Sequence, residues 1–154
     1  YQVLDEGSQI MFAATGVHAR GYHPVEGYRL LAAPEAGFVE QVFEHELGGE
    51  ADGSVPAAVV NRRLGVGLYQ VFDRAQLPHH FVWRTLGEGT YVVGIEPCTN
   101  RTAGRLDARE RGELIELAAG ETRSYDLELG ALDGAGEIDR FADRVGRATT
   151  PASR

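Results

Sequence analysis

The chain has 154 residues, 43% of them hydrophobic and 25% charged, which is enough for one domain with a buried core and too short for two large domains. The formal net charge of -8 argues against a nucleic-acid partner, because phosphate binding relies on clustered basic residues. The single Cys98 excludes an internal disulfide, and the absence of a targeting signal or of an apolar run near the roughly 20 residues that cross a bilayer predicts a cytoplasmic protein without a membrane partner.

The N-terminal part of the chain alternates between strand-forming residues and loop-forming ones. Residues 1–14 surround an acidic turn at 5–8 with apolar side chains. Residues 18–36 are rich in glycine and proline, which indicates a long irregular connection with one short strand at 28–32. His18 and His23 fall in this connection, where a solvated histidine is more common than a catalytic one.

A strict apolar alternation at residues 38–47 predicts a β-strand. Gln41 and His45 lie on the apolar face of this strand, so both project from a largely buried surface. Two interpretations are open: the side chains point towards a ligand, or protein backbone groups satisfy them.

The remaining segments predict more antiparallel strands and one helix. Residues 55–61 and 67–72 are a strand pair, 101–111 read as a polar loop, and 113–117 with 121–129 form a last strand pair. Helical spacing begins only at residues 137–145, which predicts a short amphipathic helix.

These elements together predict the fold class. About seven to nine short strands with regular turns indicate an all-β, antiparallel β-sandwich closed by one short C-terminal helix. We expect a single β-sandwich domain at residues 1–147 and a flexible tail at 148–154.

The most informative segment is residues 80–100. Alternating residues, a glycine turn at 87–89 and a β-branched return predict a β-hairpin. Glu96 interrupts the apolar end of its second strand, and Pro97 follows. Because a bare buried carboxylate costs several kcal/mol and proline ends regular pairing, we expect Glu96 to point into a rim or cleft.

The same segment carries a motif that resembles a known family. On Trp83, Arg84, the Gly-Glu-Gly turn at 87–89, the Tyr-Val-Val-Gly-Ile-Glu-Pro run at 91–97 and Asn100, the chain resembles the aldose 1-epimerase-like proteins of the domain-of-unknown-function family 4432. Further resemblance at residues 4–8, 52–61, 76–78 and 104–105 extends over most of the chain.

This resemblance implies the C-terminal part of a galactose mutarotase-like super-sandwich, whose concave face binds a sugar. In mutarotases a carboxylate takes the proton of the anomeric hydroxyl while a histidine protonates the ring oxygen, so the ring opens and closes with either configuration. Glu96 matches the position of that carboxylate. The family has a histidine-bearing segment just before the motif at residues 4–8, so we expect the N-terminal half of the family's length to lie outside this chain.

The residues themselves leave several roles open. Trp83 is suited to stack on a sugar or to fill the core, and strand alternation places it opposite to Arg84. Asn100 is suited to bind sugar hydroxyls or to cap the turn after Pro97. For the general acid, the candidates within the chain are three histidines between which no spacing argument chooses: His45, His79 and His80.

Scattered histidines and the lack of a phosphate-binding glycine motif predict neither a metal nor another cofactor. Our first hypothesis is therefore an aldose 1-epimerase-like isomerase with Glu96 as catalytic base and Trp83, Arg84, Asn100, His45, Gln41 and His80 as substrate-binding candidates. The alternative is a non-catalytic carbohydrate-binding β-sandwich. In both cases a small-molecule sugar is the expected ligand, and unpaired strand edges predict a homo-oligomer or pairing with a missing N-terminal half.

Overall fold

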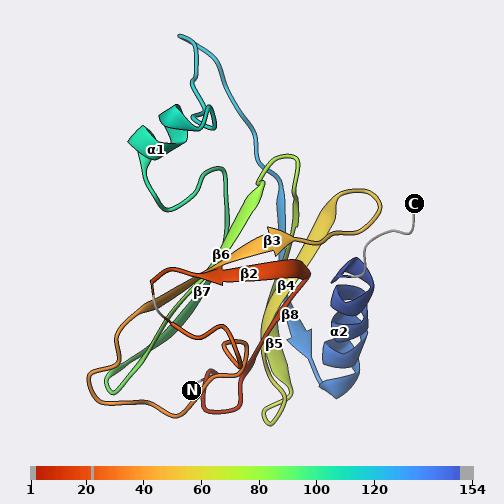
Figure 1. Cartoon of the computed structure of the whole chain (residues 1–154). Coiled ribbons are helices and arrows are strands. Elements are labelled where there is room, and N and C mark those ends of the chain that lie inside the picture. Colours follow the sequence, from red (N-terminus) through yellow and green to blue (C-terminus); the bar gives the residue numbers. More distant parts are fainter. Residues whose placement is uncertain (1–2, 22, 150–154) are drawn as a thin grey trace.

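The protein, analysed as a computed structural model that describes residues 3–21 and 23–149, is an antiparallel β-sandwich with a helix on one side (Figure 1). Within those residues it has two sheets of four strands each. Sheet A has the order β1 (Gln9–Phe12), β4 (Ser54–Asn61), β5 (Val66–Asp73) and β8 (Leu127–Asp133). Sheet B has the order β2 (Ala14–Ala19), β3 (Gln41–Leu47), β6 (His79–Gly87) and β7 (Thr90–Cys98). The predicted fold class is confirmed.

Tight turns join the two strands of each hairpin that the sequence predicted. The β4–β5 hairpin turns at Gly65 and the β6–β7 hairpin at Gly89, with φ of 69° and 78°. Glycine adopts this left-handed region without the steric cost that a β-carbon brings. The β6–β7 hairpin keeps one register from His79 opposite Cys98 to Gly87 opposite Thr90, so it fixes which side chains share a face.

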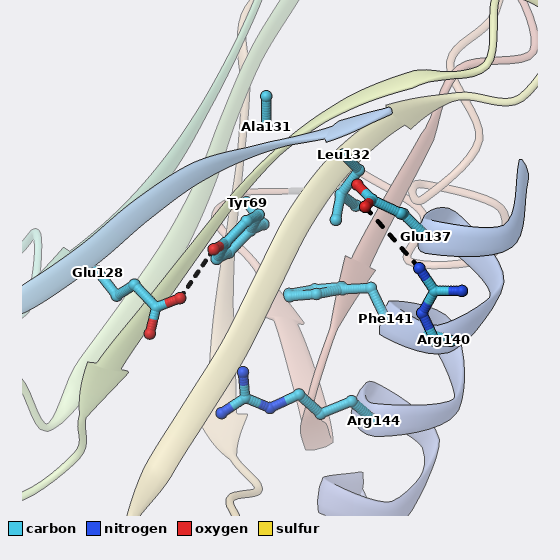
Figure 2. A pocket seen from close by; sticks show the side chains of 8 residues that line it. All are labelled: Tyr69, Glu128, Ala131, Leu132, Glu137, Arg140, Phe141 and Arg144. Carbon is cyan, nitrogen blue, oxygen red and sulfur yellow. Dashed lines mark hydrogen bonds and ion pairs between the residues drawn. The ribbon is translucent and has the colours of Figure 1, made fainter. Parts of the chain in front are cut away.

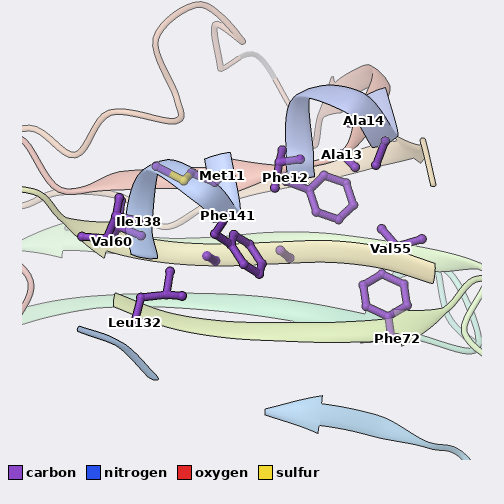
Figure 3. Packing of buried hydrophobic residues seen from close by; sticks show 14 of the residues in the cluster. Met11, Phe12, Ala13, Ala14, Val55, Val60, Phe72, Leu132, Ile138 and Phe141 are labelled. Atoms are coloured by element: carbon purple, nitrogen blue, oxygen red, sulfur yellow. The ribbon is translucent and has the colours of Figure 1, made fainter. Parts of the chain in front are cut away.

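Helix α2 (Ala135–Thr149) packs on one face of sheet A (Figure 3). Its buried side chains recur at helical spacing, with Ile138 fully buried and Phe141 and Val145 each 7% exposed. They meet residues such as Met11 and Leu132 of the sheet. Burial of an aliphatic or aromatic side chain of this size stabilises the fold by about 1.5–3 kcal/mol.

A second apolar cluster fills the space between the two sheets. Phe43 and Val82 of sheet B are fully buried there, beside Ile10 of sheet A and Leu31 of the connection before β3. Each sheet also has a face that does not meet the other sheet. Helix α2 covers this face in sheet A, whereas in sheet B this face points away from the sandwich.

Three sequence-based expectations about strands were wrong. Residues 28–32 form no strand, and only Leu30 makes an isolated bridge, to Gln9. His18 lies in β2 rather than in a loop. Residues 113–117 form no strand, and β8 instead pairs with β5. The partner of β8 is more than fifty residues away in the sequence, a distance over which a local pattern carries no information.

The helices also differ from the prediction. The predicted loop at 101–111 contains a short helix, α1 (Arg105–Glu110), in which the exposed pair Arg111 and Asp107 at i,i+4 adds a small local stabilisation. Helix α2 continues through Thr149, so residues 148–149 of the predicted tail are helical, and residues 150–154 lie outside the described part of the chain. In that described part, neither helix is long and apolar enough to span a membrane.

Candidate functional site

The strand register divides the predicted site residues between the two faces of sheet B. Directly paired residues point to the same side, so Glu44, Phe81 and Glu96 form one row across β3, β6 and β7. In the neighbouring row Trp83 lies opposite Gly94. We call this side, which points away from sheet A, the outer face of sheet B. Buried Phe81, 2% exposed, separates the two carboxylates of its row.

Glu96 lies near the end of β7 with an exposed side chain. No hydrogen bond or ion pair joins its carboxylate to the residues that the structure describes. A methyl group on Gly94 would overlap this carboxylate, so the missing β-carbon leaves the space in which the carboxylate lies. Glu96 is exposed and lines none of the four cavities described below, so its place in a rim or cleft stays a prediction.

Trp83 lies on the outer face, half-buried, and belongs to neither apolar cluster. Its indole Nε1 donates a hydrogen bond to Oε2 of Glu40, at 2.9 Å. Glu40 comes just before β3, two residues ahead of Val42, the cross-strand partner of Trp83. Of the predicted site residues on strands, Glu96 and Trp83 are the two that the fold brings to one face. Glu40 was not among the predicted site residues, because only the strand register and its hydrogen bond connect it with this pair.

Charged residues surround this part of the outer face. Arg101 forms ion pairs with Glu44 and with Glu113, the second at 3.6 Å, and so attaches the segment after β7 to β3. His18 and Glu46 interact at 3.0 Å. A cavity of about 230 Å³ lies among them, lined by His18, Glu44, His45, Glu46, Leu47, Pro78, His79 and Arg101.

The strand register also divides the histidine candidates for the general acid between the two faces of sheet B. His79 lies on the outer face, opposite Cys98 and diagonal to Glu96. His45 and His80, 4% and 0% exposed, point between the sheets, where the ring of His80 stacks on Phe12. The register thus places both on the side of sheet B opposite to Glu96, although His45 also lines the cavity of about 230 Å³.

His45 and His80 belong to a buried chain of hydrogen bonds. Arg29 Nε donates to the hydroxyl of Tyr28 at 3.0 Å, and that hydroxyl shares a hydrogen bond of 2.6 Å with His45 Nε2. His45 Nδ1 and His80 Nδ1 are 3.1 Å apart, so one ring donates to the other. His80 Nε2 has no hydrogen-bond partner among the described residues.

Burial keeps both histidines neutral. It lowers the pKa of His45 from 6.5 to about 4, and the nearby charge of Arg29 acts in the same direction. Burial also lowers the pKa of His80 well below its usual value, and a charge on His45 would lower it further. The pair is therefore part of the core, where the hydroxyl of Tyr28 and the ring and backbone of His80 are partners of His45.

The other predicted contacts with substrate also have partners inside the protein. Arg84 donates from Nε to Gln41 Oε1 at 2.8 Å and from Nη1 to the backbone oxygen of Tyr28 at 2.5 Å. Burial lowers the pKa of Arg84. Asn100 donates to the backbone oxygen of Arg101 at 3.0 Å, which fits the turn-capping alternative. Arg84 and Gln41 thus face the interior, on the side opposite to Glu96 and Trp83.

The larger hollows of the molecule lie elsewhere. A cavity of about 370 Å³ opens between β8 and α2, where Tyr69 bonds to Glu128 and Arg140 pairs with Glu137 (Figure 2). Two others, of about 630 and 680 Å³, lie beside the end of α2 and beside the start of β8. None of these three contains a predicted site residue. In residues 3–21 and 23–149, no three histidine, cysteine or acidic side chains are grouped so that they could hold a metal ion.

Comparisons with known proteins agree with this architecture. Residues 1–131 match the family described as "Domain of unknown function (DUF4432)". The fold is similar to the crystal structure of a "putative aldose 1-epimerase" from Klebsiella pneumoniae subsp. pneumoniae MGH 78578, with a TM-score of 0.88 and 21% sequence identity. That match covers 99% of this chain, and this chain spans 41% of the other. No curated protein matches the chain.

Proposed function

The chain belongs to the DUF4432 family, and on this premise we propose that the protein acts on sugars as an aldose 1-epimerase-like isomerase. The observation that carries the proposal is the pair on the outer face of sheet B. Glu96, an exposed carboxylate that pairs with none of the described residues, lies on the same face as an aromatic ring, Trp83.

The chemistry needs one base and one acid on either side of a hemiacetal. In the proposed reaction, the carboxylate of Glu96 takes the proton of the anomeric hydroxyl, and the bond between the anomeric carbon and the ring oxygen breaks as that oxygen gains a proton. The open aldehyde then closes with either configuration. The apolar C–H face of the sugar stacks on Trp83.

Two sources of the acid are compatible with this face. His79 is the candidate that shares it with Glu96, whereas His45 and His80 are buried on the other side. The other source is a histidine in protein outside this chain, which spans 41% of the similar crystal structure. Either acid would complete the same pair with Glu96.

A non-catalytic carbohydrate-binding module is the second candidate. The surroundings of Glu96 favour it, because its exposed carboxylate has no hydrogen bond or ion pair with a histidine of the described residues. Such a module would bind sugars through Trp83 without changing the rate of anomer exchange.

Glu96→Gln separates these two functions. The change keeps the shape of the side chain and removes its basicity, so we expect the loss of one positioned base to lower the mutarotation rate of freshly dissolved α-D-glucose or α-D-galactose by about 100-fold or more, measured by polarimetry. Equal rates for both proteins, with sugar binding still detected by calorimetry, would support the binding module instead.

We also propose that the open edges of the sandwich are where a further chain segment or a second copy pairs. β7 and β8 are outer strands of their sheets. Beside them, on the side of sheet A that faces sheet B, Leu68 and Leu129 are 63% and 72% exposed. Unpaired strands with exposed apolar side chains favour association.

A further inference from the structure

The tryptophan of the proposed sugar site is held in place by a residue outside that site. The indole of Trp83 has one polar atom, Nε1, and it donates to the carboxylate of Glu40 at 2.9 Å. A hydrogen bond to a charged acceptor is stronger than one between neutral groups. Since Glu40 is itself exposed and has no other described partner, this bond is its one specific interaction.

The position of the ring relative to Glu96 follows from the register. Trp83 lies directly opposite Gly94, and the carboxylate of Glu96 lies over Gly94 because no β-carbon is there. The backbone of Trp83 is therefore one strand spacing, about 5 Å, from Gly94. Glu40 lies on the opposite side of β6, next to β3, so its hydrogen bond directs the indole towards β3 and leaves the surface over Gly94 between the ring and Glu96. A ring that turned about its χ angles would leave this place, and strand geometry alone does not prevent the turn.

We propose that Glu40 is a positioning residue, which holds the Trp83 indole as a stacking platform for the sugar on the face that carries Glu96. This inference rests on the proposed function of the outer face. The hydrogen bond fixes the rotamer of Trp83 before the sugar arrives, so binding does not have to order the ring. Glu40 acts on affinity through Trp83, and it takes no part in proton transfer.

The chain has one tryptophan, so its fluorescence reports this site alone. In the wild-type protein, titration with D-glucose or D-galactose should change the emission of Trp83. Glu40→Ala should raise quenching of the free protein by acrylamide and weaken sugar affinity by about threefold to tenfold, the range of an aromatic contact. The Michaelis constant for mutarotation should rise by the same factor with little change in kcat.

Two further variants control for other effects. Glu40→Gln keeps an oxygen acceptor for the indole N–H, so it should restore affinity and quenching close to the wild-type values. Glu46→Ala removes a carboxylate from the same face, but its side-chain partner is His18, far from Trp83 in the register. It should leave both readouts unchanged.

The outcomes separate this inference from the proposed function. If Glu96→Gln abolishes mutarotation while Glu40→Ala leaves affinity, emission and quenching unchanged, the positioning role is overturned and the catalytic function stands. If Glu40→Ala weakens binding and Glu96→Gln does not change the rate, the positioning role stands for a binding module. A wild-type protein whose emission responds to neither sugar overturns the positioning role.

Discussion

At the scale of single residues, the sequence was informative about alternation and uninformative about direction. It predicted that Trp83 and Arg84 point to opposite sides of one strand, and the register agrees. The sequence could not show which of the two side chains faces the core, because both residues have an apolar part and a polar group. The answer depends on sheet A, which supplies Phe12 and Phe72 on either side of His80. Hence His80, a site candidate by sequence, is a core residue.

The buried histidines give the fold a dependence on pH. With His45 at a pKa of about 4 in the folded protein and 6.5 as its ordinary value, the unfolded chain binds more protons between these two pH values. Stability is therefore complete above pH 6.5 and falls as the pH decreases towards 4. His80 acts in the same direction.

We expect the free energy of unfolding, measured with urea, to decrease by at least about 2 kcal/mol between pH 7.5 and 5, because His45 alone supplies about that much and His80 adds to it. His45→Gln should reduce that decrease, because the titrating ring is gone. Equal stabilities of the wild-type protein at both pH values would contradict the neutral, buried pair.

At the scale of elements, the strands with near partners were predictable and those with distant partners were not. The hairpins β4–β5 and β6–β7 have short turns and alternating residues, so the local pattern contains their pairing. The apolar residues Ile115 and Leu117 suggested a strand at 113–117, but both are exposed and this segment pairs with no neighbouring strand. Helix α2 was recognised because Ile138, Phe141 and Val145 repeat at helical spacing, although its ends were set too short.

The packing of α2 on sheet A can be tested at Phe141. This ring is 7% exposed and lies 5.2 Å from the ring of Tyr69, between centroids. Phe141→Ala should lower the free energy of unfolding by about 3–5 kcal/mol, the cost of a large cavity. Asp143→Ala, on the exposed side of the same helix, should change it by less than about 0.5 kcal/mol. A similar loss for both variants in urea denaturation would show that α2 does not pack as described.

At the scale of the whole molecule, β7 and β8 are each an outer strand of their sheet, and each pairs on one side only among the described residues. Here the sequence and its family resemblance predicted unpaired strands, while the particular residues, Leu68 and Leu129, became visible only through the pairing of β5 with β8. Main-chain groups and apolar side chains at one edge both favour a partner.

We therefore expect the isolated chain to associate as its concentration rises, measured by sedimentation velocity. Leu129→Lys should weaken this association at least severalfold, because a charge on an edge strand opposes pairing. Leu64→Lys, the same change at a leucine in the β4–β5 turn that is 42% exposed, should leave it unaltered. A chain that stays monomeric at all concentrations would show that this edge needs no partner.

One practical consequence follows from the position of α2, which packs on one face of sheet A. Trp83 is half-buried, Glu96 is exposed, and neither belongs to an apolar cluster, so exchanging these two side chains should cost little folding free energy. The two sides of the sandwich are thus separable in the laboratory. Substitutions of residues that α2 covers report on whether the protein folds. Substitutions of Trp83 and Glu96, on the outer face of sheet B, report on what it recognises.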